Sequence, residues 1–361
     1  MQEAIFRFVT DGKPVKCTQI KSGHINRTYL VTTDTGAKYI LQWINRYVFP
    51  NVRALMNNIS ALTAFLAAHP DEKPAMISYM TTASGEAYYD DGKGGAWRAY
   101  RFVDNSICLQ YAETEEEFAE SARAFGHFQY ALRDFPADTL EETIVNFHNT
   151  PDRFRQLREA AEKNASGLKN TVERELDFAF AREERACALH RMREAGELPV
   201  RATHNDTKIN NVLFDADTRK AVCVIDLDTV MPGLAAYDFG DAIRFGASTG
   251  AEDEPDLNKV NLDLRLFAAF TRGYLQACPS LTPAEVDSLA LGAYTMTLEC
   301  GIRFLADYIN GDVYFSVDRP GHNLDRARTQ FKLISDMELH WDEMCALVAE
   351  EYSRIQPQFS C

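Results

Sequence analysis

The segment from His204 to Asn211 contains side chains that could carry out phosphoryl transfer. Lys208 follows Asp206 by two residues, Asn211 follows it by five, and Asp226 ends an apolar run further along the chain. A carboxylate can accept the proton of an attacking hydroxyl, Asn and Asp oxygens suit Mg²⁺, and a lysine can offset charge on the transferred group. This spacing predicts nucleotide-dependent phosphoryl transfer, with Asp206 as the base, Lys208 as the cation, and Asn211 and Asp226 as magnesium ligands.

Two further residues belong to this prediction. We expect His204 to hold the backbone of the loop by hydrogen bonds. The triplet Asp238-Phe239-Gly240 spells a metal-binding motif of protein kinases, but it lies 32 residues after Asp206, whereas Asp226 lies 20 residues after it and ends a strand. We therefore expect Asp238 to tether the catalytic loop. The alternative is a polar loop that only caps the next strand, and Asp226 downstream argues against it.

The elements before residue 104 are predicted to form a small sheet. β-branched runs at 15–21, 27–33 and 38–44 are separated by Gly and Asp turns, which indicates an antiparallel meander. Apolar residues then recur at helical spacing over 52–68, and a second hairpin follows at 86–89 and 96–103.

The chain after residue 104 is predicted to be mainly helical, with a β-rich segment at 200–230 that carries the catalytic residues. The expected helices are 115–134, 152–163, 171–194, 258–277, 283–309 and 323–353. We predict an α+β fold of two lobes, 1–103 and 104–361. A short link between two lobes is a natural place for a ligand cleft.

Composition limits the partners. The chain has 361 residues and a net charge of −15, so it should repel nucleic acid and anionic membranes. It has no apolar run of roughly 18 residues, the length that a membrane-spanning helix needs. We expect a cytoplasmic protein, a monomer or weak dimer, that acts on a small molecule.

The order H-x-D-x-K-x-x-N, followed by a strand that ends in Asp, resembles the catalytic loop of kinase-like phosphotransferases. Protein kinases usually carry Arg at the position after this histidine, and the chain has Asn205 there. In this it resembles the small-molecule branch, which includes aminoglycoside, choline and homoserine kinases. Four blocks between residues 23 and 330 also resemble the N-acetylhexosamine 1-kinases. They are Gly23-His24-Ile25-Asn26 to Thr33, His204 to Lys208, Ile225 to Asp241, and Glu299-Cys300-Gly301 to Tyr308.

The resemblance implies a bilobal, protein-kinase-like fold. It implies transfer of the γ-phosphate of ATP, with Mg²⁺, to the anomeric hydroxyl of N-acetylglucosamine or N-acetylgalactosamine. The roles that it implies for the nucleotide are a loop over ATP with Gly23, His24 and Asn26, and a hinge with Arg101, Phe102 and Val103. The sugar contacts that it implies are Asp228, Arg303 and Tyr314, with Phe245 and His24 as weaker candidates.

The residues themselves leave some of these roles open. Asp228 could orient the loop instead of touching substrate, and Arg303 could pair with a carboxylate such as Asp228. Tyr314 could simply pack, and His24 could stabilise its turn. A cationic acceptor would favour carboxylates or aromatic rings in the pocket, so an inward-pointing Arg303 argues against choline-like substrates.

One departure from kinase-like folds concerns the third strand. A Lys or Arg usually stands there and pairs with a Glu of the next helix, yet this chain has the neutral Gln42 and no acidic residue from Asn51 to His69. We expect Gln42 to hydrogen-bond Asn57 or Asn58, and neither Lys38 nor Arg46 to act as a substitute. The missing pair also leaves a second function class open, a nucleotide-binding pseudokinase, which the Asp206, Asn211 and Asp226 set opposes.

Overall fold

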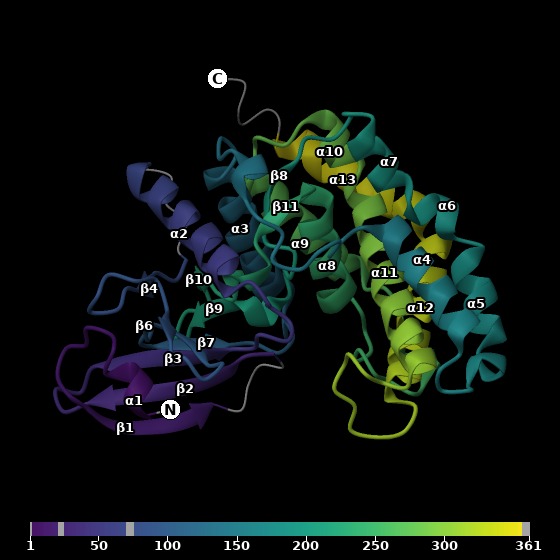
Figure 1. Cartoon of the computed structure of the whole chain (residues 1–361). Coiled ribbons are helices and arrows are strands. Elements are labelled where there is room, and N and C mark those ends of the chain that lie inside the picture. The colour runs from purple at the N-terminus through teal and green to yellow at the C-terminus, as the bar shows by residue number, and fades with distance from the viewer. Residues whose placement is uncertain (1, 21–24, 70–75, 356–361) are drawn as a thin grey trace.

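The computed structural model describes residues 2–20, 25–69 and 76–355, which form a sheet-rich part and a larger helical part (Figure 1). The first sheet is antiparallel in the order β1-β2-β3-β6-β4, and β5 also pairs with β6. Its strands are β1 (Pro14–Ile20), β2 (Arg27–Thr33), β3 (Lys38–Ile44), β4 (Tyr79–Met80), β5 (Tyr89–Asp90) and β6 (Ala96–Arg101). The predicted antiparallel meander is confirmed, and β2 and β3 have the predicted limits.

The first sheet buries residues on both faces because its strands alternate. Val31, Leu41 and Ala99 point to one face, where they form a small core with helix α1 (Gln2–Ile5). Ile40 and Ile44 belong to the main core on the other side, with helix α2 (Val52–Ala68). The sheet therefore has a covered inner face on which polar side chains must find partners.

The second part begins where the chain leaves β6. Strand β7 (Ser106–Cys108) pairs with β9 (Val212–Asp215), which pairs with β10 (Ala221–Val224). Strands β8 (Arg201–Thr203) and β11 (Met231–Gly233) form a separate two-stranded pair. The catalytic segment thus lies between short strands, as predicted, and the exact division at residue 103 stays a prediction.

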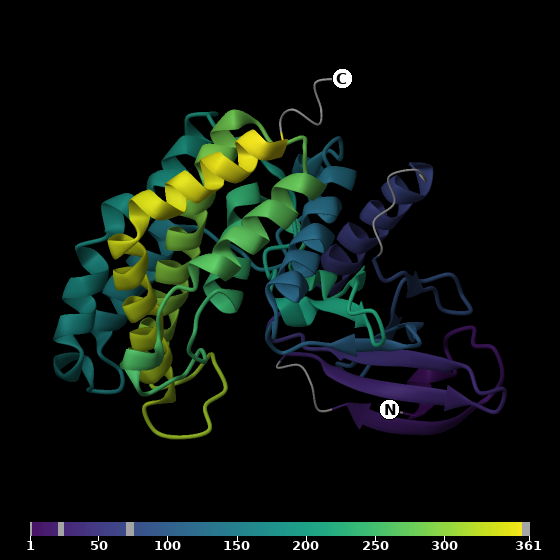
Figure 2. The same ribbon diagram turned by 180° about the vertical axis from the view of Figure 1, so that it is seen from behind.

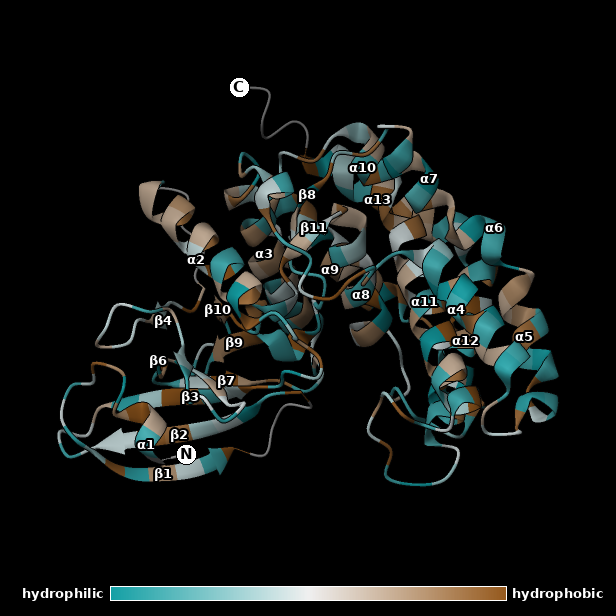
Figure 3. Cartoon of the chain, in the orientation of Figure 1, coloured by the Kyte–Doolittle hydropathy of each residue, from teal (hydrophilic) through white to brown (hydrophobic). Residues whose placement is uncertain are grey.

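Helices make up most of the second part and lie side by side at its outer end (Figures 1 and 2). They are α3 (Glu115–Ala131), α4 (Thr150–Lys163), α5 (Glu173–Phe180), α6 (Glu183–Ala186), α7 (Ala188–Glu194), α8 (Ala235–Gly246), α9 (Leu264–Ala277), α10 (Pro283–Asp287), α11 (Leu289–Asn310), α12 (His322–Leu339) and α13 (Trp341–Ile355). The outer helices α4, α5 and α12 mix hydrophilic and hydrophobic residues along their length (Figure 3), as amphipathic helices do. No helix in the described ranges has the length and apolar character to cross a bilayer.

Three predicted helices are interrupted. The segment 171–194 forms three short helices, 283–309 breaks at Ser288, and 323–353 breaks at His340. The Ser288 hydroxyl donates to the Glu285 carbonyl at 2.7 Å, a local bond that competes with helix continuation. Apolar periodicity alone does not reveal such breaks, because the same buried face continues through the turn.

Helices α8 and α11 approach closely at two glycines. A Cβ atom on Gly240 would lie 2.2 Å from the Gly292 carbonyl oxygen, and one on Gly292 would lie 2.2 Å from the Ala236 carbonyl oxygen. Both neighbours are backbone atoms, which cannot turn aside. The glycines therefore set the distance of α8 from the long helix α11, and α8 carries Asp238.

We predict that Gly292→Ala will destabilise the protein by about 1–3 kcal/mol, the usual cost of overpacking. Because α8 would move, phosphoryl transfer should weaken as well. Urea unfolding measures the first effect. Ser60→Ala on the exposed face of α2 is the control and should change stability little. An unchanged unfolding midpoint for Gly292→Ala would contradict the close approach.

Candidate active site

Asp238 of α8 holds the start of the loop that runs from His204 to Asn211. One carboxylate oxygen accepts from the backbone N–H of His204 at 2.9 Å and from Gln129 at 2.7 Å, and the other accepts from the N–H of Asn205 at 2.7 Å. All four of these residues are buried. The prediction that Asp238 tethers the loop is confirmed.

His204 joins the loop to the strand that precedes Asp226. Its Nε2 lies 2.9 Å from the Ile225 carbonyl oxygen, and its Nδ1 accepts from the Asp206 N–H at 3.3 Å. These two bonds require the tautomer in which Nε2 carries the proton. Phe125 packs edge-on against the ring, with centroids 5.3 Å apart. The expected hydrogen-bonding of His204 is confirmed.

Asp206, Lys208 and Asn211 form one cluster. The Lys208 Nζ lies 3.1 Å from an Asp206 carboxylate oxygen, and the Asn211 amide donates to the other carboxylate oxygen at 2.9 Å and to the Asp206 carbonyl at 2.8 Å. Burial raises the pKa of Asp206, but the charge of Lys208 and these hydrogen bonds outweigh it and hold the pKa below its usual value. Asp206 is therefore ionised at neutral pH, as a proton acceptor must be. Phe245 flanks the cluster, with its ring centre 5.9 Å from the Lys208 Nζ.

Asp226 stands apart from this bonding. Its backbone is left-handed, with φ 59°, a conformation that is costly for a residue other than glycine. Its carboxylate makes no hydrogen bond or ion pair with any other residue of the described ranges. Burial, together with the negative charges of Asp228 and Asp206, raises the pKa of Asp226 to about 7.

The donors present suit Mg²⁺. Asp226 offers an unpaired carboxylate, and Asn211 spends its amide nitrogen on Asp206, so that its oxygen has no partner within residues 2–20, 25–69 and 76–355. Mg²⁺ commonly binds one or two such side chains and takes its other ligands from water and phosphate. The described residues contain no group of three or more His, Cys, Asp or Glu side chains that could hold a metal ion. The magnesium role of Asn211 and Asp226 stays a prediction that this donor set supports.

Asp228 is held by residues of the first sheet. One carboxylate oxygen forms a buried ion pair with Arg98 of β6, and the other accepts from the Asn26 amide at 2.6 Å. The Asp228 side chain is 3% exposed and the Arg98 side chain is 0% exposed. A contact between Asp228 and substrate stays a prediction, and it would require one of these partners to move.

Arg98 is the cation that sequence reasoning missed. It pairs in register with Gln42, donates from Nε to the Gln42 side-chain oxygen at 3.0 Å, and lies over the ring of Tyr79. Its Nη2 has no hydrogen-bond partner in the described part of the chain. The available signal was a charged residue inside the otherwise apolar run Ala96–Tyr100, but only the sheet register places it beside Gln42.

The expected bond between Gln42 and helix α2 is wrong. The Gln42 amide donates to Thr28 at 3.2 Å and its oxygen accepts from Arg98, while Asn58 bonds to the carbonyls of Glu141 and Val230. Gln42 therefore supports a cation on the neighbouring strand instead of bonding to the helix. The expectation for Lys38 and Arg46 is confirmed in its geometry, because these pair with Asp104 and Asp90 at the surface.

The predicted nucleotide contacts are only partly visible. Gly23 and His24 lie outside the described residues. Asn26 is engaged by Asp228 and by the Asn45 N–H at 3.0 Å.

The predicted hinge follows β6 directly. The Phe102 N–H bonds to the Lys38 carbonyl at 3.0 Å and the Val103 carbonyl accepts from Ser106 at 2.7 Å, while Arg101 ends the strand. The roles of Arg101, Phe102 and Val103 at adenine stay predictions.

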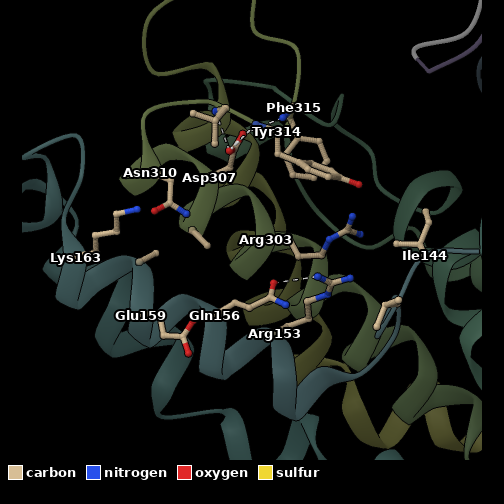
Figure 4. Close-up of a pocket in the computed structure, with 14 residues that line it drawn as sticks. Ile144, Arg153, Gln156, Glu159, Lys163, Arg303, Asp307, Asn310, Tyr314 and Phe315 are labelled. Atoms are coloured by element: carbon tan, nitrogen blue, oxygen red, sulfur yellow. Dashed lines mark hydrogen bonds between the residues drawn. The ribbon is translucent and has the colours of Figure 1, made fainter. Parts of the chain in front are cut away.

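Arg303 and Tyr314 meet at a separate pocket of about 400 Å³ between α4, α11 and the loop that follows α11 (Figure 4). Arg303 points into the pocket, which is the orientation on which the argument against choline-like substrates depends. Within the described ranges its guanidinium makes no hydrogen bond or ion pair, and it lies over the rings of Phe147 and Phe315. It does not pair with Asp228, which Arg98 occupies.

Comparison with known proteins agrees with this geometry. The sequence pattern of the phosphotransferase enzyme family (APH) matches residues 16–277. The chain belongs to this family. The family segment includes all three sheets except the first two residues of β1, and it includes the loop from His204 to Asn211 and Asp226, whereas Arg303 and Tyr314 lie beyond it.

Solved structures with a similar fold span nearly the whole chain. A microcompartment-associated aminopropanol kinase aligns with TM-score 0.65 and 16% identity over 95% of this chain and 97% of its own. Choline kinase from Cryptosporidium parvum Iowa II aligns with TM-score 0.57 and 14% identity over 93% and 92%. A spectinomycin phosphotransferase solved with ADP and spectinomycin aligns with TM-score 0.56 and 11% identity over 94% of both chains. The bilobal kinase-like fold, with an antiparallel first lobe and a helical second lobe, is confirmed.

We predict that Mg²⁺ binding will strengthen roughly tenfold between pH 6 and pH 8. With a pKa of about 7, Asp226 keeps its proton at pH 6 and loses it by pH 8, and only the carboxylate binds metal. The same shift means that this group makes the metal-free protein less stable as pH rises from about 4 to about 7, because over that range the folded state holds a proton that the unfolded state has lost.

The measurement is a titration with MgCl₂ in the absence of nucleotide, in which the melting temperature is recorded at each MgCl₂ concentration and each pH. Asp226→Asn should abolish the response. Equal Mg²⁺ affinity at both pH values would count against a titrating ligand.

A double-mutant cycle tests the Arg98–Asp228 pair. Arg98→Met and Asp228→Asn should each destabilise the protein by about 3–5 kcal/mol, because each leaves an unpaired buried charge. The double variant removes both charges and should cost clearly less than the two single changes together. The exposed pair Lys38–Asp104 is the matched control, with an expected coupling below about 1 kcal/mol. Additive costs at Arg98 and Asp228, measured by urea unfolding, would show that the pair does not interact in this way.

Proposed function

We propose that this phosphotransferase moves the γ-phosphate of ATP to a hydroxyl of a small sugar, with the anomeric hydroxyl of an N-acetylhexosamine as the first candidate. The observation that carries the proposal is the cluster of Asp206, Lys208 and Asn211 beside the unpaired carboxylate of Asp226. The aminopropanol, choline and spectinomycin enzymes of similar fold are named for different acceptors, and one was solved with ADP. Family membership and the ADP in the spectinomycin enzyme support ATP as the donor.

Each group in the cluster has a part in the transfer. The acceptor oxygen bonds to the γ-phosphorus, the bond to the leaving ADP oxygen breaks, and Asp206 takes the hydroxyl proton. Lys208 offsets charge on the transferred group, and Asn211 and Asp226 hold Mg²⁺, which neutralises phosphate charge when bound. His204 and Asp238 keep the base and the metal ligand at a fixed separation, which matters because catalysis of this kind depends on positioning.

Arg98 supports the nucleotide side of the site. Kinase-like folds usually supply a cation from the third strand, and here a buried arginine stands on the adjacent strand, next to Gln42 and near Asp226. Its pairing with Asp228 resembles the usual ion pair in chemistry, although the acidic partner comes from the second lobe. The pseudokinase alternative rested on a missing cation, so Arg98 weakens it.

The pocket that Arg303 lines favours a sugar acceptor over a cationic one. Arg303 would repel choline or a protonated aminoglycoside, whereas its guanidinium can donate to hydroxyl or acetamide oxygens. Tyr314 and Phe315 add aromatic surface at the same place. Homoserine and other small alcohols remain the second candidate class.

The proposal predicts ADP release with ATP, Mg²⁺ and N-acetylglucosamine or N-acetylgalactosamine. Asp206→Asn should lower the rate by roughly 10²- to 10⁴-fold, as general-base loss usually does. A coupled assay over these sugars, glucose, galactose, choline and homoserine measures both points. Asp138→Asn, outside the site, is the control for a lost carboxylate and should keep full activity.

The outcomes separate the candidates. Turnover of choline or homoserine alone would keep the chemistry and remove the sugar assignment. Full activity in Asp206→Asn would remove Asp206 as the base. Nucleotide binding without transfer to any acceptor would favour the pseudokinase.

A further inference from the structure

The pocket that holds Arg303 gathers positive charge in a chain whose net charge is −15. Arg303 on α11 and Arg153 on α4 both line it, and Lys163 lies at the other end of the same helix face. Figure 4 shows the guanidinium groups of the two arginines directed into the same space. Two like charges at one site raise each other's free energy unless an anion lies between them.

Neither arginine forms an ion pair with a carboxylate in the part of the chain that the structure describes. Arg153 donates to the Phe147 carbonyl at 2.8 and 3.2 Å and to the Gln156 side chain at 3.0 Å, all of them uncharged acceptors. Arg303 makes no hydrogen bond or ion pair with the described residues, and its guanidinium carbon lies 5.2 Å from the Phe147 ring centre and 5.5 Å from that of Phe315. Burial and the neighbouring charge of Arg303 lower the pKa of Arg153, which reflects the same unmatched charge.

The acidic residues of the pocket are already committed elsewhere. Asp307 accepts from the backbone N–H groups of Val313, Tyr314 and Phe315 at 2.9–3.0 Å and so points at the loop rather than at the arginines. Glu159 pairs with Arg155 on the outside of α4. The lining still has three cationic side chains, Arg153, Lys163 and Arg303, against these two carboxylates, so positive charge is in excess.

The pocket is connected to the catalytic loop by one short segment. Thr143 donates to the Asp228 carbonyl at 2.8 Å, and the His148 ring bridges Glu299 of α11 and the Asn205 carbonyl. Phe147, between them, lies under Arg303 and accepts from Arg153. A small molecule in this pocket thus lies against the segment that also contacts the loop of the proton acceptor.

We infer that the preferred acceptor is an anionic derivative of the sugar proposed above, whose carboxylate or phosphate Arg153 and Arg303 bind on the side away from the reacting hydroxyl. This deepens the proposed function and rests on it, because it names the substrate class of the same site. A guanidinium binds both kinds of anion through two parallel hydrogen bonds, so the two sources share one chemistry. A volume of about 400 Å³ is within the range for a small ligand.

Matched sugar pairs test the inference. Glucose is compared with glucuronic acid, and N-acetylglucosamine with N-acetylglucosamine 6-phosphate, by kcat/KM for ADP release. The anionic member of at least one pair should be preferred, and which pair responds tells a carboxylate from a phosphate. Arg303→Gln should raise KM for that sugar about tenfold, equivalent to about 1.4 kcal/mol, and change the neutral sugar less than threefold.

Two controls sharpen this test. Arg303→Lys keeps the charge and should recover part of the preference. Arg265→Gln removes a cation whose side chain is 76% exposed, on α9, and should leave the preference unchanged. Arg303 is the better target than Arg153, because it has no hydrogen bond within the described ranges whose loss would disturb folding.

A binding experiment separates failure of the inference from failure of the proposed function. Calorimetry on the Asp206→Asn variant measures the same four sugars without transfer. Binding of an anionic sugar that depends on Arg303, with no turnover of any sugar by the native enzyme, would keep the anion site and reject sugar phosphorylation. Neutral sugars bound as tightly as anionic ones, no binding of either anion, or an equal effect of Arg303→Gln on both members of a pair would each overturn the inference.

Discussion

The site must hold three carboxylates, those of Asp206, Asp226 and Asp228, close together in a partly buried place. Their mutual repulsion would favour protonation or unfolding unless each charge is offset. Each carboxylate has a different environment. Lys208 pairs with Asp206, and Arg98 pairs with Asp228. Asp226 has no partner among the described residues, and its pKa is raised to about 7. Only the last one has a strained backbone. The residue that lacks a protein partner is thus the one predicted to bind Mg²⁺, and a strained, unpaired carboxylate of this kind is consistent with that prediction.

The backbone scaffold makes this arrangement rigid. Asp238 fixes the N–H groups of the loop, His204 fixes the distance from the loop to the strand before Asp226, and Thr229 donates to the His204 carbonyl at 2.7 Å. Asp238 in turn depends on the position of α8, which the contact between Gly240 and Gly292 sets. The packing distance between α8 and α11 therefore determines where Asp238 lies, and through Asp238 it determines the position of the loop that carries Asp206.

The sequence predicted the site residues that lie close together along the chain, but it did not reveal contacts between distant segments. The spacing from His204 to Asn211 and the strand before Asp226 carry their own signal, because these residues act within a few positions of one another. Arg98 could not be found in this way, since its role follows from its register opposite Gln42 and from an ion pair with a residue 130 positions away. The same holds for Arg153, whose importance appears only when α4 and α11 are packed together. The break at Ser288 escaped because periodicity records the buried face and not the hydrogen bond that ends a helix.

The Arg98–Asp228 pair also limits how the two lobes can move. Arg98 belongs to the first sheet and Asp228 to the segment after β10, so the pair joins the lobes where kinase-like folds usually keep the ion pair inside one lobe. Separation of the lobes at this point would break a buried ion pair. A hinge motion that keeps the pair intact has to pivot about it. Because Arg98 fixes β6 to the second lobe, relative movement is expected at the outer strands β1 and β2 rather than at β6.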